Sequence, residues 1–106
     1  MDFKFIDIAF LNKYVRVKDK NITLSCETNN ENATVTLEHP LNATFGNRLR
    51  RVGQRFVLTE VELNDTGIYS CIATNGTVEI KMELGILYVR EGEIIFIIVK
   101  VLTVSL

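Results

Sequence analysis

The stretch "LNDTGIYSC", residues 63–71, decides the fold of this chain. Asp65, Gly67, Tyr69 and Cys71 occupy every second position in it, and residues so spaced share one face of a β-strand. The stretch therefore predicts a strand that carries a cysteine on its inward face. We expect a second sulfur to lie opposite.

The sequence contains one other cysteine, Cys26, far from Cys71 along the chain. This separation excludes the close spacing of a zinc knuckle or of a redox C-x-x-C pair. A structural disulfide is the favoured interpretation. A pair of reduced, buried thiols in a cytosolic protein is the alternative, and cysteine usage alone does not separate the two.

The asparagines favour the disulfide. The sequence contains five N-x-T sequons, whereas chance predicts about one in a chain of this composition. This excess is typical of a glycoprotein of the secretory pathway, in an oxidising compartment, and predicts an extracellular or cell-surface location. The acceptor asparagines are Asn21, Asn32, Asn42, Asn64 and Asn75.

Length and composition predict one domain. The 106 residues are 47% hydrophobic, which is enough for one core, and the net charge of −1 gives no reason to expect a nucleic-acid partner. Residues 1–11 are interpreted as a truncated N-terminal segment without a signal-peptide pattern, and residues 12–89 as the domain. Residues 90–106 form an apolar tail that is interpreted as the start of a membrane span, with mistranslated intron or an extra buried strand as the alternative; both ends are interpreted as cut from a longer protein.

The middle of the chain alternates apolar and polar residues in short runs that are separated by Asn-, Asp- and Gly-rich breaks. This pattern predicts a β-sandwich or barrel without a helix of normal length, and a hairpin turn at Asn75-Gly76. The predicted inward residues are Ile22, Leu24, Cys26, Phe56, Leu58, Tyr69, Cys71, Ala73, Val78, Ile80, Met82 and Leu84.

The run "FVLTEVELNDTGIYSCIATNG", together with "NITLSC", resembles the immunoglobulin superfamily, most closely its intermediate or constant-like sets. This resemblance implies an all-β, two-sheet antiparallel sandwich with Greek-key connections. It implies that the Tyr69 hydroxyl bonds to backbone near a turn shaped by Asp65 and Gly67. The family's usual Trp position falls on Leu37, so we expect Phe45 or Phe56 to fill the space.

The sequence contains no pattern that predicts an enzyme. It lacks a nucleophile paired with a base, a spaced set of metal ligands and a phosphate-binding loop, and we expect no cofactor. The single histidine, His39, precedes Pro40 in a predicted loop. The lone histidine and Asp65 are therefore interpreted as loop and turn residues.

The family resemblance implies an extracellular recognition module of a cell-surface receptor or adhesion protein, which binds a protein ligand through a sheet face. A secreted decoy or soluble ligand-binding protein is one alternative, and a structural spacer in a longer ectodomain is another. A longer transcript would separate them. A membrane helix after the domain favours a receptor, a stop codon soon after it favours a decoy, and many tandem domains favour a spacer.

The segment "RLRRVGQR", residues 48–55, concentrates positive charge. Its arginines, Arg48, Arg50, Arg51 and Arg55, are expected on an edge strand, where charge blocks sheet-to-sheet pairing. By the family resemblance, one of them is expected to pair with Asp65. The alternative is an anion-binding surface for sulfated glycosaminoglycan, because guanidinium groups bind sulfate oxygens in bidentate fashion.

Overall fold

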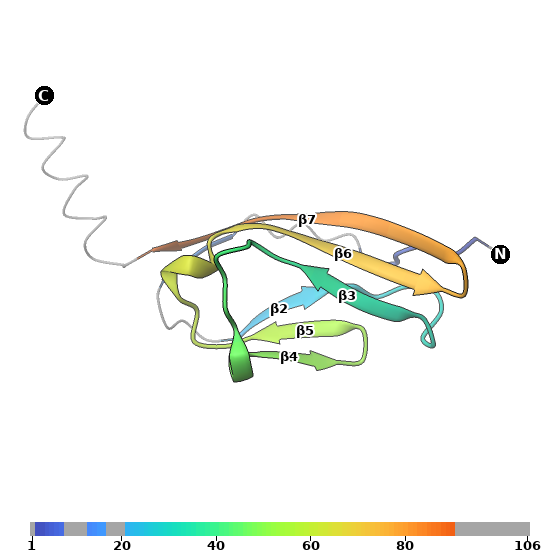
Figure 1. Cartoon of the computed structure of the whole chain (residues 1–106), viewed down its shortest axis with the longest axis horizontal. Helices are drawn as coiled ribbons and strands as arrows, with labels where there is room; N and C mark the ends of the chain where they lie inside the picture. The colour runs from blue at the N-terminus through green and yellow to red at the C-terminus, as the bar shows by residue number, and fades with distance from the viewer. Residues whose placement is uncertain (1, 8–12, 17–20, 91–106) are drawn as a thin grey trace, which may run out of the picture.

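The computed structural model describes residues 2–7, 13–16 and 21–90, and it consists of seven strands and two short 3-10 helices in those ranges. Figure 1 shows the strands gathered in two layers. The strands are β1 (Lys13–Arg16), β2 (Ile22–Ser25), β3 (Thr34–Glu38), β4 (Leu49–Val52), β5 (Arg55–Leu58), β6 (Gly67–Asn75) and β7 (Val78–Arg90), and the helices are η1 (Gly46–Arg48) and η2 (Leu63–Asp65).

The two layers are one sheet with the order β1-β7-β6-β3 and a second with the order β2-β5-β4. This is the predicted two-sheet sandwich, with one difference in strand direction. β1 runs parallel to β7, whereas the other pairs are antiparallel. Before β1, Phe5 forms an isolated antiparallel bridge with Thr28, outside the named strands.

The core lies between the sheets and is closed by the Cys26–Cys71 disulfide, which confirms the predicted bridge and joins Cα atoms 5.5 Å apart. Leu37 is buried opposite Cys71 in the β3–β6 register. Phe56 is also buried, while the half-buried Phe45 packs against the core with its ring centroid 6.4 Å from that of Tyr69. Both phenylalanines therefore help to fill the space around a leucine that is smaller than an indole.

The β6–β7 hairpin differs slightly from its prediction. Asn75 pairs with Val78, so the two loop residues are Gly76 and Thr77, one position later than expected. Val78 is half exposed rather than inward, because it stands at the tip of the hairpin beyond the core. The register shifts between Tyr69 and Ser70, opposite Leu84, and the buried apolar side chains of β7 are Leu84, Leu87 and Val89.

Several boundaries also differ from the sequence pattern. β5 ends at Leu58, because residues 59–65 turn back through η2, and β7 continues through Arg90. Phe3 and Phe5, from the predicted N-terminal segment, pack against the core. The predicted membrane tail from residue 91 onward lies outside the described residues, and no helix within them is long and apolar enough to cross a bilayer.

Candidate recognition surface

One end of the sandwich is closed by a buried ion pair between Arg48 and Asp65. We call this ion pair, together with Tyr69 and Glu62, the corner. Asp65 is 0% exposed and accepts two hydrogen bonds from Arg48, at 2.8 Å from Nη1 to Oδ2 and 3.0 Å from Nη2 to Oδ1. The backbone N–H of Glu62 also donates to Asp65, and the Glu62 carboxylate lies 3.2 Å from Arg48. Both oxygens of the Asp65 carboxylate are therefore occupied by hydrogen bonds that hold the fold.

Tyr69 completes the corner. Its hydroxyl donates to the backbone oxygen of Asp65 at 2.6 Å, which is the bond that the resemblance implied. Burial, and then the negative charge of Asp65, raises the pKa of Tyr69 well above its ordinary value. Gly67 is required beside it, because a Cβ at this position, where φ is +147°, would lie 2.4 Å from Pro40 Cγ.

The four arginines of residues 48–55 do not form one surface. Arg48 belongs to η1 rather than to an edge strand, and the Asp65 carboxylate raises its pKa. Arg55 forms an ion pair with Glu27. Arg50 and Arg51 are exposed on β4, which ends its sheet, and neither has an ion pair among the described residues. Two of the four candidate anion-binding residues thus remain available.

The five sequon asparagines are all exposed. None of them lies in the middle of a strand: Asn75 is the last residue of β6, and the others lie outside the strands. Asn32 lies two residues after Asn30, and Asn30 lines a small pocket together with Asn75. The sequons at Asn32 and Asn75 therefore lie at the same end. At the opposite end, Asn21 precedes β2, Asn42 follows β3 and Asn64 lies in η2.

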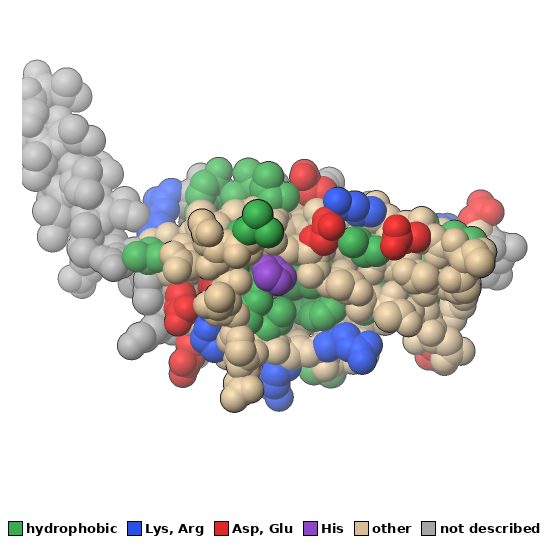
Figure 2. Space-filling view, in the orientation of Figure 1, with side chains coloured by type: hydrophobic (Ala, Val, Ile, Leu, Met, Phe, Trp, Pro, Cys, Tyr) green, Lys and Arg blue, Asp and Glu red, His purple; other side chains and the backbone are tan. Residues whose placement is uncertain are grey.

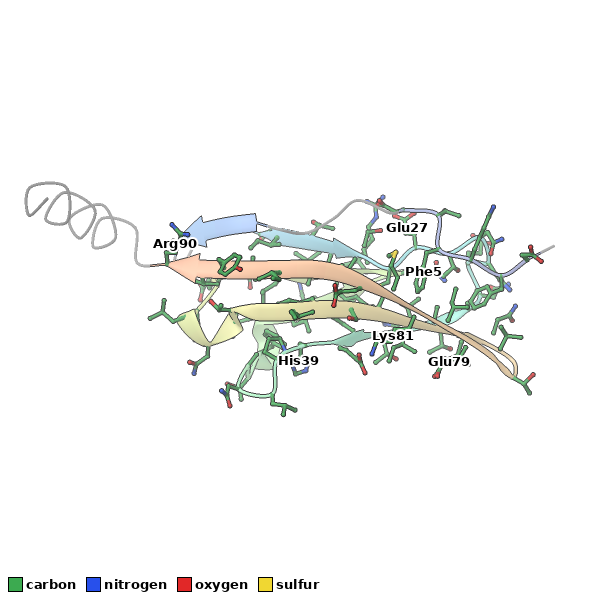
Figure 3. The ribbon with its side chains drawn as sticks, turned by 90° about the horizontal axis from the view of Figure 1, so that it is seen from above. Phe5, Glu27, His39, Glu79, Lys81 and Arg90 are labelled. Carbon is green, nitrogen blue, oxygen red and sulfur yellow. A yellow bond between two sulfur atoms is a disulfide. The ribbon has the colours of Figure 1, made fainter. Side chains whose placement is uncertain are left out.

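A shallow hollow of about 560 Å³ lies on the outer side of β3, β6 and β7; we call it the β3–β7 hollow. The small side chain of Ser70 is part of its lining, and two exposed apolar residues stand beside it, Ile68 at 52% and Leu41 at 100% exposure. The rest of the lining consists of Leu37, Glu38, His39, Lys81 and Glu83. Lys81 and His39 are labelled on this side of the molecule in Figure 3.

A larger groove of about 730 Å³ opens at the end of the sandwich where Asn32 lies. It runs between residues 27–32 and the β4–β5 turn, and Gln54 holds these two segments together. The Gln54 side chain accepts from the Thr28 N–H at 2.8 Å and donates to the Asn30 and Ala33 carbonyls at 2.9 and 3.1 Å. Because Asn32 is part of the lining, a glycan there would cover this groove.

Sequence reasoning missed the residues of the β3–β7 hollow. Leu41 follows Pro40 in a predicted loop, and Ile68 lies on the opposite face of its strand from the signature residues. One signal was available. Ile68 lies between Gly67 and Tyr69, which belong to the inward face of the predicted strand, so this apolar side chain is expected to point outward. His39 is exposed, as expected of a loop residue, and its ring meets that of Phe45 edge-on with centroids 4.7 Å apart.

No model of a known protein family matches the sequence, and no curated protein matches it. Solved structures do. The extracellular domains 3–5 of Drosophila OTK superpose with a TM-score of 0.64 at 18% identity, over 83% of this chain and 31% of that one. The N-terminal four Ig domains of Dscam1 isoform 7.44 give 0.66 at 14% identity, over 82% and 24%. The insect immune protein hemolin gives 0.62 at 22% identity, over 83% and 22%.

The molecule therefore has the immunoglobulin fold: a disulfide-linked, two-sheet β-sandwich of the kind found in these proteins. The chain spans about a quarter to a third of the length of the first structures that it matches. Within the described residues, no group of three or more His, Cys, Asp or Glu side chains is arranged to hold a metal ion. The arrangement offers two main concave surfaces, the larger groove beside Asn32 and the smaller β3–β7 hollow.

Proposed function

We propose that this chain is an extracellular recognition module of a cell-surface receptor or adhesion protein of the immunoglobulin superfamily. It binds a protein ligand through the outer face of the β1-β7-β6-β3 sheet and does so without catalysis. The immunoglobulin fold, which recurs in the adhesion and receptor structures above, supports the class of protein. The disulfide and the five exposed sequons support the extracellular location.

The observation that carries the proposal is the contrast between the ends of the sandwich and this sheet face. The ends hold the sequons, and glycans attached there would shield the loops. The middle of the face holds no sequon asparagine, yet it exposes Ile68 beside a hollow, and Leu41 is exposed at the edge of that hollow. Exposed apolar side chains with a polar rim are typical of protein-binding sites. Asn42 is the sequon nearest to the face, because it follows Leu41.

Glycan mapping tests the first half of this contrast. The protein is expressed in a eukaryotic host and its peptides are analysed asparagine by asparagine. We expect glycans on at least two of the five sequons. Occupancy of fewer than two would mean that the excess of sequons is compositional and would remove the shielding argument.

A pair of matched variants tests the binding face. Ile68→Glu places a charge beside the hollow, whereas Leu63→Glu places the same charge at a residue of similar exposure, 48%, in η2. Beads that carry many copies of the domain are scored for adhesion to a panel of cell types. We expect Ile68→Glu to reduce adhesion at least tenfold and Leu63→Glu to leave it unchanged. Equal adhesion of all three proteins would contradict the use of this face.

The decoy and spacer alternatives predict different outcomes. A secreted decoy would bind its ligand through the same face, and its transcript would stop soon after the domain. A structural spacer would show no adhesion to any cell type as an isolated domain. The adhesion assay therefore separates recognition from spacing, and the transcript separates a decoy from a receptor.

Arg50 and Arg51 favour a second candidate function, the binding of sulfated glycosaminoglycan along the exposed β4 edge. Both guanidinium groups lack ion-pair partners among the described residues, whereas Arg48 is held in the corner. Retention on immobilised heparin is the test, with Arg50→Glu/Arg51→Glu compared with the native protein. We expect the variant to elute at lower salt, because each lost cation removes one counterion-releasing contact. Elution of both proteins together would leave the arginines as edge protection.

A further inference from the structure

The larger groove, which we call the Asn32 groove, has a floor whose polar groups bond to one another. The Thr28 hydroxyl donates to the Asn30 carbonyl at 2.8 Å, and the Asn30 side chain accepts from the Asn32 N–H at 3.0 Å. Gln54 adds its bonds to the same loop, and its backbone carbonyl accepts from the N–H of Cys26 at 2.9 Å. The floor is therefore held in one conformation before any occupant arrives.

The N-terminal segment contributes to the wall of this groove and is fixed in a similar way. The Ile6 N–H donates to the Glu27 carbonyl at 2.9 Å, and the Asn29 side chain bonds to the backbone of residues 2–4. The Ile6 side chain nevertheless stays 55% exposed in the lining. Val52 of the β4–β5 turn, at 58% exposure, belongs to the same lining. Two branched apolar side chains thus stand in a groove whose other lining residues are mostly polar.

Charge in the Asn32 groove is nearly balanced. Glu27 and Arg55 form an ion pair with each other, and Glu31 is exposed. An anionic ligand would therefore meet no unpaired cation among the described lining residues. Figure 2 shows the end of the sandwich where β3 begins, on the right, covered mainly by backbone and by side chains that are neither charged nor hydrophobic. The groove suits a neutral occupant that carries hydrogen-bonding groups.

A neutral carbohydrate has this chemistry. Each sugar ring has C–H groups on its faces and hydroxyl groups around its edge, so a sugar can lie against Ile6 or Val52 and still donate to Glu31. N-acetylglucosamine, the sugar that joins an N-linked glycan to asparagine, also carries an acetamido group, which bonds as the surrounding amides do. The groove, at about 730 Å³, lies in the range of about 300–1,000 Å³ that is usual for small-molecule sites.

Asn32 can supply such a carbohydrate from within the chain. It is exposed, it begins a sequon, and it is part of the lining. A glycan on its amide nitrogen begins inside the groove, so its effective concentration there is high. The bond from the Asn32 N–H to Asn30 also fixes the backbone that carries the glycan. Asn42 differs from Asn32, because it lines neither this groove nor the β3–β7 hollow.

We propose that the Asn32 groove is a binding site for the chain's own N-linked glycan, and that the N-acetylglucosamine joined to Asn32 packs against Ile6 and Val52. The inference rests on the glycosylation that the proposed function expects, but it goes further. A glycan that lies in the groove is part of the folded structure, whereas a shield extends into solvent. It fastens the β2–β3 loop to the β4–β5 turn and closes this end of the sandwich to other ligands.

The test is the rate at which an endoglycosidase cleaves the glycans of the native protein. The chain is produced in a host that attaches only oligomannose glycans, so that every site carries the same substrate. Peptide mapping follows the cleavage at each asparagine. We expect cleavage at Asn32 to be about tenfold slower than at Asn42, which corresponds to a contact free energy of about 1.4 kcal/mol. The two rates should become equal once the protein is reduced and unfolded.

Two matched variants identify the contact. Ile6→Ser/Val52→Ser removes the apolar walls of the groove, whereas Leu41→Ser removes the fully exposed apolar side chain that precedes Asn42. We expect the first variant to raise the rate at Asn32 to that at Asn42, and the second to change neither rate. Circular dichroism shows that each variant is folded. The native protein, trimmed to one N-acetylglucosamine at each site, should also give nuclear Overhauser effects between this sugar and the Val52 methyl groups.

Equal rates at Asn32 and Asn42 in the native protein would overturn the proposal, as would slow cleavage that persists in folded Ile6→Ser/Val52→Ser. A mass analysis that finds no glycan on Asn32 would overturn it too. The binding face is tested separately by Ile68→Glu. If the Asn32 glycan is protected and Ile68→Glu leaves adhesion unchanged, the glycan site stands and the proposed function is wrong.

Discussion

The corner and the β3–β7 hollow use the same kinds of residue in opposite ways. In the corner, Asp65 is wholly buried and each of its carboxylate oxygens accepts a hydrogen bond. In the hollow, Glu83 is exposed, and the apolar Ile68 stands beside it in solvent. The two regions lie on neighbouring residues of the same strand, since Gly67 and Tyr69 belong to the corner side and Ile68 to the hollow side.

This difference teaches which residues hold the fold and which are free to recognise a partner. A buried charge that loses its partner is costly, whereas an exposed charge is screened and contributes little to stability. Substitutions in the core and corner should therefore change the free energy of unfolding, and substitutions around the hollow should change binding alone. The predictions below test this division, beginning with the largest expected effect.

Removal of the disulfide is expected to have the largest effect on stability. The bond closes a loop of 45 residues between the two sheets. In a chain-entropy model, Cys26→Ala/Cys71→Ala would lower the free energy of unfolding by about 4 kcal/mol. Denaturant unfolding of the native and variant proteins measures the change. Mass analysis without reductant gives an independent check, since two free thiols in the folded, secreted protein would refute the bridge.

Arg48→Met should lower the free energy of unfolding by about 3 kcal/mol, because it leaves the Asp65 carboxylate buried without its cation. Arg50→Met is the matched control. Its guanidinium has no ion pair among the described residues, so a change within about 0.5 kcal/mol is expected. Equal effects of the two variants in denaturant unfolding would mean that the corner does not stabilise the fold more than an exposed strand residue does.

Much of the fold could be predicted because its signals are local in sequence. The alternation through Cys71 identifies a strand and its inward face. The glycine at position 67 indicates a backbone conformation that residues with a side chain rarely adopt. The parallel direction of β1 could not be predicted in this way, because alternation defines the faces of a strand and not its neighbour. The position of the β6–β7 loop, shifted by one residue, likewise depends on pairing between strands.

The candidate site was less predictable for a physical reason. Four arginines in one segment look alike in sequence, yet Arg48 enters the corner through η1 while Arg50 remains exposed on β4. Their difference arises from which residue faces Asp65 in three dimensions. The hollow depends on a small residue, Ser70, between larger neighbours of separate strands, and no local pattern encodes that arrangement.

Tyr69→Phe should have a smaller effect, which depends on pH. Loss of the bond to the Asp65 backbone oxygen should lower the free energy of unfolding by about 1 kcal/mol at neutral pH. Because the folded state raises the pKa of Tyr69, the native protein keeps this proton above pH 10 while the unfolded chain releases it. Stability is therefore full below about pH 10 and falls as pH rises further, by at most about 1.4 kcal/mol per pH unit for one proton.

In Tyr69→Phe this alkaline decrease should be smaller by one proton than in the native protein. Denaturant unfolding at a series of pH values up to about pH 11 measures the slope for each protein. An unchanged slope in Tyr69→Phe would show that a different group titrates.

Apart from the Arg50→Met control, the smallest expected effect on stability belongs to Ile68→Glu, and it is the sharpest test of the division between the two regions. Ile68 is 52% exposed and lies opposite Ile86 in the β6–β7 register, so the change removes a cross-strand apolar pair but leaves the core intact. We expect the free energy of unfolding to change by less than about 1 kcal/mol. Adhesion should nevertheless decrease at least tenfold, because the new carboxylate must be desolvated on docking. A loss of stability comparable to that of Arg48→Met would place Ile68 among the residues that hold the fold, and the decrease in adhesion would then report unfolding rather than recognition.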